Sequence, residues 1–535
     1  DSRNDYFMPT RGTYQRVGLE TTLPGSTVTA LATHGNVLYA GGLFKTVGGQ
    51  TREAFAAFDA TTGALLPWTA NAVRGRTDLP KEVNEGRAIA VSPDGAKVVV
   101  GGDLFSINGQ YSHSIAIVSG ASLTDGSGGQ VLRTYSPGFI PDTSVTKTII
   151  DGGDGRFYIG NEGTGGGVFD GKAAFSWATG DQVWRDTCLG ATQSLVMYQG
   201  TLYSASHAHD CSGINAFNDG IRRYFMAQNP DSMEVLGWLP LGNDGIGEGI
   251  GPRALAVATG NASGQRYLWS GGDFTTINGR AQQGLTRFGP QDTGAPPTPV
   301  ASAQATSDGT IQVRFRTVVD ADDSHLTYSV YRGNATEPVW SGTGRSLWWE
   351  RPQVTFVDAD VTPGASYTYR VTASDGTNTS ARSAAVSATA RAAGADYPAA
   401  VRADGPTSLW SGSTNGTWAH DSGAAQTRTD AVPATLMDGA TVSADGAVPA
   451  AGGSLRFDGV DDYAITDQLR PGPSTYTVEA WINTTTTAGG KIAGFGNGRP
   501  RTGSNISNLS GSYDRHVSMQ NDGRITFGVW VGGAS

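Results

Sequence analysis

The sequence contains no run of about twenty apolar residues, which is the length that a membrane-spanning helix requires. Basic residues are also scarce, because 38 lysines and arginines stand against 48 acidic residues and leave a formal net charge of −10. Binding to a nucleic-acid backbone or to an anionic membrane needs a basic surface. We therefore expect no nucleic-acid partner and no insertion into a membrane.

Cysteine is rare, since the chain has only Cys188 and Cys211. Few cysteines and few lysines, together with 76 glycines, suit an exported bacterial protein, so we expect a secreted, extracellular or cell-surface location. The two thiols are then expected to form one disulfide. The alternative is a zinc site in which His207 and His209, on one face of a strand, join the cysteines. Zinc needs thiolates in reducing surroundings, so we favour the disulfide.

Motifs of known catalytic chemistry are missing as well. The sequence has no HExxH, no CxxC, no nucleophile elbow and no phosphate-binding glycine loop. Paired carboxylates for glycosidic cleavage can lie on distant strands and leave no local pattern. We expect a protein that is not an enzyme, with a polysaccharide-active enzyme as the alternative.

One short phrase recurs through the first half of the chain. Each copy is an apolar strand, a glycine pair and a tight turn, and the copies span Leu38–Gly49, Val99–Gly109 and Leu268–Gly279. Weaker copies begin at Phe157 and Leu202. Five recurrences at roughly 45 to 65 residues, each with room for four strands, are typical of β-propeller blades. We predict an all-β chain whose residues 1–290 form a five-bladed propeller, with six blades as the alternative.

The fifth module stops after Leu285–Phe288, before any fourth strand. A blade without its outer strand exposes unpaired backbone groups at its edge. The segment Thr13–Val17 precedes the first module and has no partner strand of its own. We predict that this segment supplies the missing strand and closes the ring.

The residue that follows the glycine pair occupies an equivalent position in every module. Aligning the modules gives Leu43, Asp103, Glu162, His207 and Asp273. If this position faces the central channel, three carboxylates and one imidazole converge there and could hold a hard cation or present acids to a ligand. The alternative is that each carboxylate caps the adjacent turn by accepting backbone N–H groups. We favour the cap, because the leucine interrupts the ring.

A stiff, proline-rich linker over residues 291–299 follows the propeller. Strands with period-two alternation come after it at Ile311–Phe315, Leu326–Arg332 and Val361–Ala373. With these strands, residues 300–391 resemble a fibronectin type III domain. The resemblance implies a β-sandwich spacer in which Tyr367 or Tyr369 is buried and hydrogen-bonds back to the preceding turn.

The last segment carries a different set of motifs, which are Leu455–Tyr463, Tyr476–Ile482, Lys491–Gly496 and Ile525–Trp530. In this order they make residues 395–535 resemble the first half of a laminin-G-like, concanavalin A-like jelly roll. The later strands of that family are absent from the sequence. The resemblance therefore implies a fragment of a longer protein, or a sheet that another chain completes, including self-assembly through this incomplete domain.

The same resemblance implies glycan and calcium binding near one acidic loop. Asp458, Asp461 and Asp462 lie in this loop, and Trp530 lies in a strand. Acidic loops beside aromatic platforms can bind Ca²⁺ and stack against sugar rings. Trp481, in the predicted strand Tyr476–Ile482, has a core or rim position as its alternative role.

The repeats with Gly-Gly-x-Phe are similar to those of propellers that begin secreted multidomain proteins of actinobacteria. Taken together, the sequence predicts a secreted or cell-surface binding and adhesion protein that recognises a glycan or a surface partner. The alternatives are a polysaccharide-active enzyme with the propeller as its catalytic module and a structural subunit of an extracellular fibre.

Overall fold

The chain divides into two units in the computed structural model. The residues that the structure describes are 27–73, 85–163, 169–186, 188–218, 220–238, 240–245, 250–259, 264–289, 294–305, 309–320, 323–392, 397–411, 418–423, 432–443, 445–447, 453–466, 472–496 and 513–529. Unit 1 comprises Asp1–Ile214, Ile221–Val235 and Pro240–Pro290, and unit 2 comprises Asn215–Gly220, Leu236–Leu239 and Gln291–Ser535.

Strands make up almost all of the described regular structure, so the predicted all-β class is confirmed. The described helices are α1 (Tyr397–Ala403) and a single 3-10 turn at Ser212–Ile214. Within the described residues no helix is long and apolar enough to cross a membrane.

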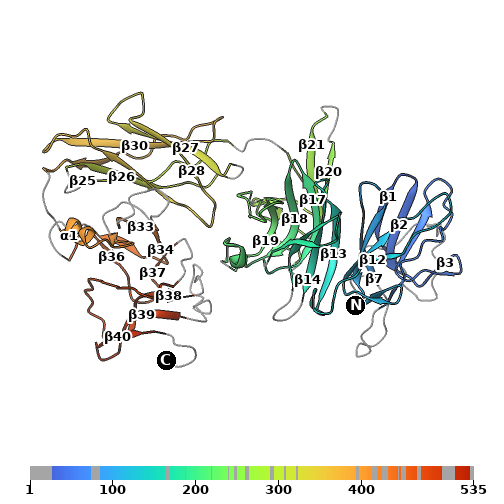
Figure 1. The fold of residues 1–535 in the computed structure, drawn as a ribbon. Coiled ribbons are helices and arrows are strands. Elements are labelled where there is room, and N and C mark those ends of the chain that lie inside the picture. The colour runs from blue at the N-terminus through green and yellow to red at the C-terminus, as the bar shows by residue number, and fades with distance from the viewer. Residues whose placement is uncertain are drawn as a thin grey trace. The chain divides into compact units, whose positions relative to one another are not determined.

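Unit 1 consists of five successive antiparallel modules (Figure 1). The first module consists of β1 (Thr27–His34), β2 (Val37–Leu43) and β5 (Phe55–Asp59), and the second consists of β7 (Glu85–Val91), β8 (Lys97–Asp103), β11 (Ile115–Ser119) and β12 (Val131–Arg133). The third module consists of β13 (Ser144–Asp151), β14 (Arg156–Gly163), β15 (Lys172–Ser176) and β16 (Gln182–Arg185). The fourth consists of β17 (Thr192–Tyr198), β18 (Thr201–Ala208) and β19 (Arg223–Gln228), and the fifth consists of β20 (Pro252–Thr259), β21 (Arg266–Gly272) and β24 (Leu285–Phe288). One residue pair, Leu43 with Glu85, joins the first module to the second.

Tight hairpins follow the glycine pairs, as the sequence predicts. The short strands of these hairpins are β3 (Thr46–Val47), β4 (Gln50–Thr51), β9 (Ser106–Ile107), β10 (Gln110–Tyr111), β22 (Thr276–Ile277) and β23 (Arg280–Ala281). A further short strand, β6 (Ala72–Val73), comes after β5 and pairs with β9. In the second hairpin Asn108 and Gly109 both have positive φ, at 46° and 80°. Two consecutive positive φ angles define the type I′ turn, which suits the twist of paired strands and favours Asn-Gly.

Consecutive modules pack against each other through apolar side chains. Buried residues of the first and second modules, including Tyr39, Trp68 and Val100, form one cluster, and Ile149, Phe157 and their neighbours form the next. The first strands β1, β7, β13, β17 and β20 lie in that order through unit 1 (Figure 1). Among the described strands no contact of similar extent joins β20 to β1. Closure of the ring therefore stays a prediction, and Thr13–Val17 lies outside the described residues.

Unit 2 contains two antiparallel sheets that share one core. The strands of the three-stranded sheet are β25 (Ala301–Ala305), β26 (Ile311–Arg316) and β29 (Gln353–Asp358), and those of the four-stranded sheet are β28 (Trp340–Arg345), β27 (His325–Arg332), β30 (Ser366–Ser374) and β31 (Val386–Thr389). Both sheets contribute buried side chains to this core, such as Phe315 from the three-stranded sheet and Tyr328 and Val371 from the four-stranded sheet.

The two tyrosines considered from the sequence divide the expected role between them. Tyr369 is fully buried, and its hydroxyl donates a hydrogen bond to Asp358 Oδ2 at 2.7 Å. The Tyr367 hydroxyl accepts the hydrogen bond from the preceding turn, from Thr362 N at 2.9 Å. Burial and the bond to the turn thus belong to two residues of one strand.

The remaining described strands form three small sheets. They are β32 (Trp410–Ser411), β33 (Trp418–Asp421), β34 (Ala434–Met437) and β37 (Tyr463–Thr466); β35 (Thr441–Ser443) and β36 (Ser454–Arg456); and β38 (Gly490–Gly496), β39 (Tyr513–Met519) and β40 (Ile525–Gly528). The predicted strand Tyr476–Ile482 is not one, because these residues pair with no neighbouring strand among those described. Alternation alone does not make a strand where no ladder partner lies beside it.

Strand β33 covers the outer face of the three-stranded sheet. Gln353 exchanges two hydrogen bonds with the backbone of Asp421, from Nε2 to the carbonyl at 3.1 Å and from the Asp421 N–H to Oε1 at 3.2 Å. His420 Nε2 and Ser302 Oγ lie 2.5 Å apart, and Arg316 donates to Thr435 Oγ1 at 2.7 Å. A polar sheet face is therefore buried within unit 2 by partners that match it.

Candidate functional site

The first strand of every module contains one extra residue, which in the first, second and fifth modules lies opposite the glycine pair. The strand pairing shifts at Thr29, Arg87, Lys147, Gln193 and Arg253. A β-bulge of this kind leaves one residue unpaired and redirects its side chain. Three of these five bulge residues are basic.

The bulge explains the second glycine of the pair. A Cβ on Gly102 would lie 2.0 Å from the carbonyl oxygen of Glu85, and one on Gly42 would lie 2.0 Å from that of Thr27. At Gly272 the nearest backbone atoms would be 2.5 Å away. In these three modules the bulged backbone thus occupies the space that a side chain would need. The third and fourth modules have Asn161 and Ser206 at the equivalent position, so their bulges accommodate a side chain there.

Two of the predicted ring residues form ion pairs with the bulge residues. Lys147 Nζ lies 2.9 Å from Glu162 Oε2, which also accepts a hydrogen bond from Gln193 Nε2 at 3.2 Å. Arg253 forms an ion pair with Asp273. Each of the two carboxylates therefore has a cationic neighbour.

The charges around Glu162 influence each other. Burial opposes ionisation of this carboxyl, but Lys147, Gln193 and Arg87 outweigh burial and hold the pKa of Glu162 below its usual value. Burial lowers the pKa of Lys147, and Arg87 lowers it further, whereas Glu162 and Glu85 oppose the shift. Arg87 itself pairs with Glu85 at 2.5 Å. The modules that contribute these side chains thus share one network of alternating charge.

His207 borders this network in a neutral form. Its Nε2 accepts a hydrogen bond from Ala191 N at 3.2 Å, and its Nδ1 is buried with no hydrogen-bond partner among the described residues. Burial lowers the pKa of His207 to about 4, Arg222 and His209 add to the shift, and Glu162 opposes it. His207 is therefore uncharged at neutral pH.

Among the described residues, the ring carboxylates do not gather into a group with the spacing of metal ligands. Asp103 ends β8, where it lies opposite Glu85. The basic bulge residues were not singled out from the sequence, although a signal exists. Arg87, Lys147 and Arg253 each stand at the start of the apolar run that opens a module, which an alignment of those runs shows.

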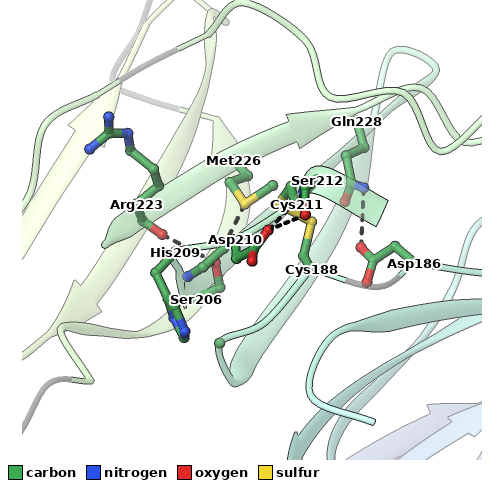
Figure 2. The surroundings of a disulfide bond; sticks show 12 residues. Asp186, Cys188, Ser206, His209, Asp210, Cys211, Ser212, Arg223, Met226 and Gln228 are labelled. Carbon is green, nitrogen blue, oxygen red and sulfur yellow. Dashed lines mark hydrogen bonds between the residues drawn. A yellow bond between two sulfur atoms is a disulfide. The ribbon is translucent and has the colours of Figure 1, made fainter. Parts of the chain in front are cut away.

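The predicted disulfide is present. Cys188 and Cys211 are joined, with their Cα atoms 4.1 Å apart, in the region shown in Figure 2. His209 does not turn toward the sulfurs as a ligand, since its Nδ1 lies 3.4 Å from the carbonyl of His207. The disulfide accounts for both cysteines, so the alternative zinc site is wrong.

The acidic loop of unit 2 brings its three predicted carboxylates together. Ligand atoms of Asp458, Asp461 and Asp462 all lie within 4.8 Å of one another, and no other such group occurs in the described parts of the chain. Asp458 Oδ1 accepts hydrogen bonds from the N–H groups of Val460 at 2.8 Å and Asp461 at 3.4 Å. These bonds, the one from Val460 first, lower the pKa of Asp458.

The third carboxylate is anchored by the loop itself. Asp462 Oδ2 accepts the Asp458 N–H at 2.8 Å, and Asp462 Oδ1 is buried without a hydrogen-bond partner among the described residues. A Cβ on Gly439 would lie 2.8 Å from that oxygen, so glycine leaves room for the carboxylate. Trp530, predicted as part of the same site, lies outside the described residues.

Trp481 does not take the core position that was one of its expected roles. It is 67% exposed, and its Nε1 donates a hydrogen bond to the Tyr397 hydroxyl at 2.6 Å. The ring lies edge to face against Tyr397, with centroids 6.4 Å apart. Its exposure follows from the missing strand at Tyr476–Ile482, which leaves this side chain without a sheet to pack on.

No protein-family model matches the chain, and no curated protein matches it in sequence. Three of the solved structures that resemble it are each 11% identical. They include the computationally designed protein Ika4 (TM-score 0.19; 52% of this chain and 99% of that one) and a europium-containing methanol dehydrogenase (0.26; 65% and 71%). A third is a glycoside hydrolase family 43 arabinoxylan arabinofuranohydrolase from Bacillus subtilis in complex with cellotetraose (0.25; 67% and 93%). TM-scores this low establish neither a shared fold nor a shared activity.

Proposed function

We propose that this chain is a non-catalytic binding protein of the cell exterior that recognises a glycan at the Asp458–Asp462 loop with the help of bound calcium. The observation that carries the proposal is the convergence of Asp458, Asp461 and Asp462 in an accessible loop. Ca²⁺ prefers oxygen ligands, with carboxylates foremost among them. Bound there, the ion would supply positive charge that sugar hydroxyls can coordinate.

The donor set fits such an ion. Asp458 and Asp461 are exposed, and Asp462 offers the unpartnered Oδ1. The hydrogen bonds within the loop occupy Asp458 Oδ1 and Asp462 Oδ2, which leaves one oxygen of each carboxylate for a cation. Next to them Phe457 is 49% exposed and Val460 is 83% exposed, and these apolar groups offer a surface for the C–H face of a sugar ring.

Two of the predicted ring carboxylates of unit 1 favour a scaffold over a catalytic module, whereas burial raises the pKa of a third carboxyl group in this unit, that of Asp170. Glu162 and Asp273 are engaged with Lys147 and Arg253. A glycosidase needs one carboxylic acid with a raised pKa beside a second, free carboxylate. The lowered pKa of Glu162 is the opposite of what a general acid requires.

The architecture proposed for this function has a propeller in unit 1 and a fibronectin type III-like spacer and lectin-like segment in unit 2. Five consecutive modules with equivalent bulges support the propeller. The two sheets that share a core, with Tyr367 bonded to the preceding turn, support the spacer. The Cys188–Cys211 disulfide supports export to an oxidising compartment.

Retention on immobilised polysaccharides with and without Ca²⁺ tests the proposal. We expect the full chain to be retained by at least one polysaccharide, to be released by a chelator and to return with added Ca²⁺. The triple variant Asp458→Asn, Asp461→Asn and Asp462→Asn should lose retention at least about tenfold, because neutral amides bind Ca²⁺ far more weakly than carboxylates.

Asp375→Asn is the matched control. Asp375 Oδ1 accepts the N–H groups of Thr377 at 2.7 Å and Asn378 at 2.6 Å, which is the same turn geometry as at Asp458. Asp375 belongs to no group of three possible metal ligands in the described parts of the chain. This variant should bind like the parent protein. Equal retention of parent and triple variant, or retention that a chelator does not change, would contradict the proposal.

A second candidate function, assembly between copies of the chain, is favoured by one strand. Ile525 and Phe527 of β40 are 54% and 55% exposed, and β40 lies at the end of its sheet among the described strands. An exposed apolar edge is a template for a further strand. Light scattering on the parent protein and on Phe527→Lys distinguishes the candidates, because only assembly through β40 makes the mass depend on this residue.

A further inference from the structure

A lysine and an aspartate lie side by side in the interior of unit 1. Lys172 is the first residue of β15, and Asp186 directly follows β16. The Asp186 N–H donates a hydrogen bond to the carbonyl of Lys172 at 2.9 Å, which continues the ladder that pairs Ala173 with Arg185. Residues opposite each other in an antiparallel pair place their side chains on the same face. The strand register therefore holds this amine against this carboxylate.

Both side chains are withdrawn from water. Lys172 is 0% exposed and Asp186 is 1% exposed, and Lys172 Nζ lies 3.3 Å from Asp186 Oδ2. The Nζ atom makes no hydrogen bond with the described residues. An ammonium group carries three N–H donors, and burying them without acceptors is strongly unfavourable. As an ion pair, this arrangement leaves the lysine poorly satisfied.

The carboxylate, in contrast, is held firmly. Asp186 Oδ1 accepts the backbone N–H of Lys172 at 2.9 Å. Figure 2 shows the other bond, in which Asp186 Oδ2 accepts a hydrogen bond from Gln228 Nε2 at 3.2 Å. Gln228 is itself fully buried, and its Oε1 has no hydrogen-bond partner among the described residues. The side chain of Gln228 therefore brings one N–H donor, on Nε2, and one unused acceptor, Oε1, to the Lys172–Asp186 pair.

We propose that Lys172 and Asp186 become joined by an isopeptide bond between Nζ and Cγ. One proton of the ammonium group passes to Oδ2, which gives a neutral amine and a carboxylic acid. The amine lone pair attacks Cγ, and a second proton moves from Nζ to Oδ2. The C–Oδ2 bond breaks, water leaves, and the third proton stays on the amide nitrogen.

This condensation needs no oxidant, reductant or further reactant. A desolvated lysine amine is a nucleophile, and the fixed register supplies the high effective concentration of an intramolecular reaction. The Gln228 N–H that binds Oδ2 assists its departure. Oδ1 remains as the amide carbonyl and keeps its hydrogen bond from the Lys172 backbone.

The product satisfies the site better than the ion pair does. A secondary amide has a single N–H, and the unpartnered Gln228 Oε1 is the acceptor available for it. No buried charge remains. Cys188 stands two residues after Asp186, so the disulfide would tie this part of the chain to Cys211, beyond the end of β18, and the isopeptide bond would tie it to β15.

The intact mass of the full, reduced chain tests the proposal directly. We expect a mass lower than that of the sequence by one water. Trypsin should then cleave after Arg185 but not after Lys172, and fragment spectra should show the peptide that ends at Arg185 linked to the peptide that begins at Asp186. A full mass, or free cleavage after Lys172, would overturn the proposal and leave an ordinary ion pair.

Loss of water also accompanies succinimide formation at Asp-Gly sequences, and Asp170-Gly171 lies nearby. Hydroxylamine opens a succinimide and leaves an isopeptide bond intact, so the linked peptide must survive this treatment. Lys172→Arg keeps the charge but cannot form the bond, and it should show the full mass and no linked peptide. A lost water that persists in Lys172→Arg would assign the change to another residue and contradict the proposal.

Discussion

At the scale of single residues, the decisive feature is how each ionisable side chain is compensated when it is buried. Glu162, Asp273 and Asp358 each have a cation or a tyrosine hydroxyl beside them. The acidic ring positions could be found from the sequence because they recur at a fixed place in the repeat. Their partners could not, because which side chain faces Glu162 depends on the bulge and on packing between modules.

His420 gives a prediction at this scale. It is 1% exposed, lies 2.5 Å from Ser302 Oγ through Nε2, and has Arg314 nearby on the sheet that it covers. Burial and then Arg314 hold the pKa of His420 well below its usual value. The unfolded chain thus binds a proton below about pH 6.5 that the folded chain does not bind, so stability is lost as the pH falls.

Urea unfolding of the parent protein and of His420→Gln checks this expectation. Between about pH 7.5 and pH 5, we expect His420→Gln to lose about 2 kcal/mol less unfolding free energy than the parent, which is the linkage of one proton over that interval. His325→Gln, at an exposed position of β27, should follow the parent. Parallel pH profiles of the parent and His420→Gln would show that His420 is protonated in the folded chain.

At the scale of elements, the repeat predicted the strands and turns well and the bulges not at all. The local sequence is enough to predict the strand at Val98–Val100, because its residues are β-branched. It is also enough to predict the turn at Asn108–Gly109, because these two residues accept positive φ angles. A bulge is a property of two strands, so one strand's sequence does not show it. At Tyr476–Ile482 the sequence instead predicts a strand that the structure does not contain. The residues alternate as in a strand, but no partner strand lies beside them.

Gly102→Ala tests the pairing of bulge and glycine. A methyl group there would lie 2.0 Å from the Glu85 carbonyl oxygen, and backbone cannot yield as a side-chain tip can. We expect a loss of about 3 kcal/mol in unfolding free energy, at the upper end of what overpacking costs.

Gly109→Ala is the control for this change. Gly109 has a φ of 80°, and a methyl group added there would meet no atom within 4 Å, so alanine should cost only about 1 kcal/mol for its left-handed backbone. Equal losses in the two variants, measured by thermal and urea unfolding, would mean that the bulge does not require the second glycine.

At the scale of the whole molecule, each unit shows something that the linear order of segments does not. In unit 1 each module contacts the next one along the chain, as a repeat of similar length predicts. In unit 2 the sequence suggests a spacer followed by a separate domain. However, Gln353 and Arg316 of the three-stranded sheet are hydrogen-bonded to Asp421 and Thr435 of the segment that follows. Polar strand residues look solvent-exposed in a sequence whether water or another strand faces them.

The central claim is that this chain binds carbohydrate without cleaving it, with recognition in unit 2 and a scaffold in unit 1. Incubation with each polysaccharide that retains the protein, followed by measurement of released sugar ends, tests the claim most directly. We predict calcium-dependent retention with no release above the background of the polysaccharide incubated without protein. Release of sugars that persists in this triple variant and disappears in Glu162→Gln would contradict the account and identify unit 1 as a catalytic module.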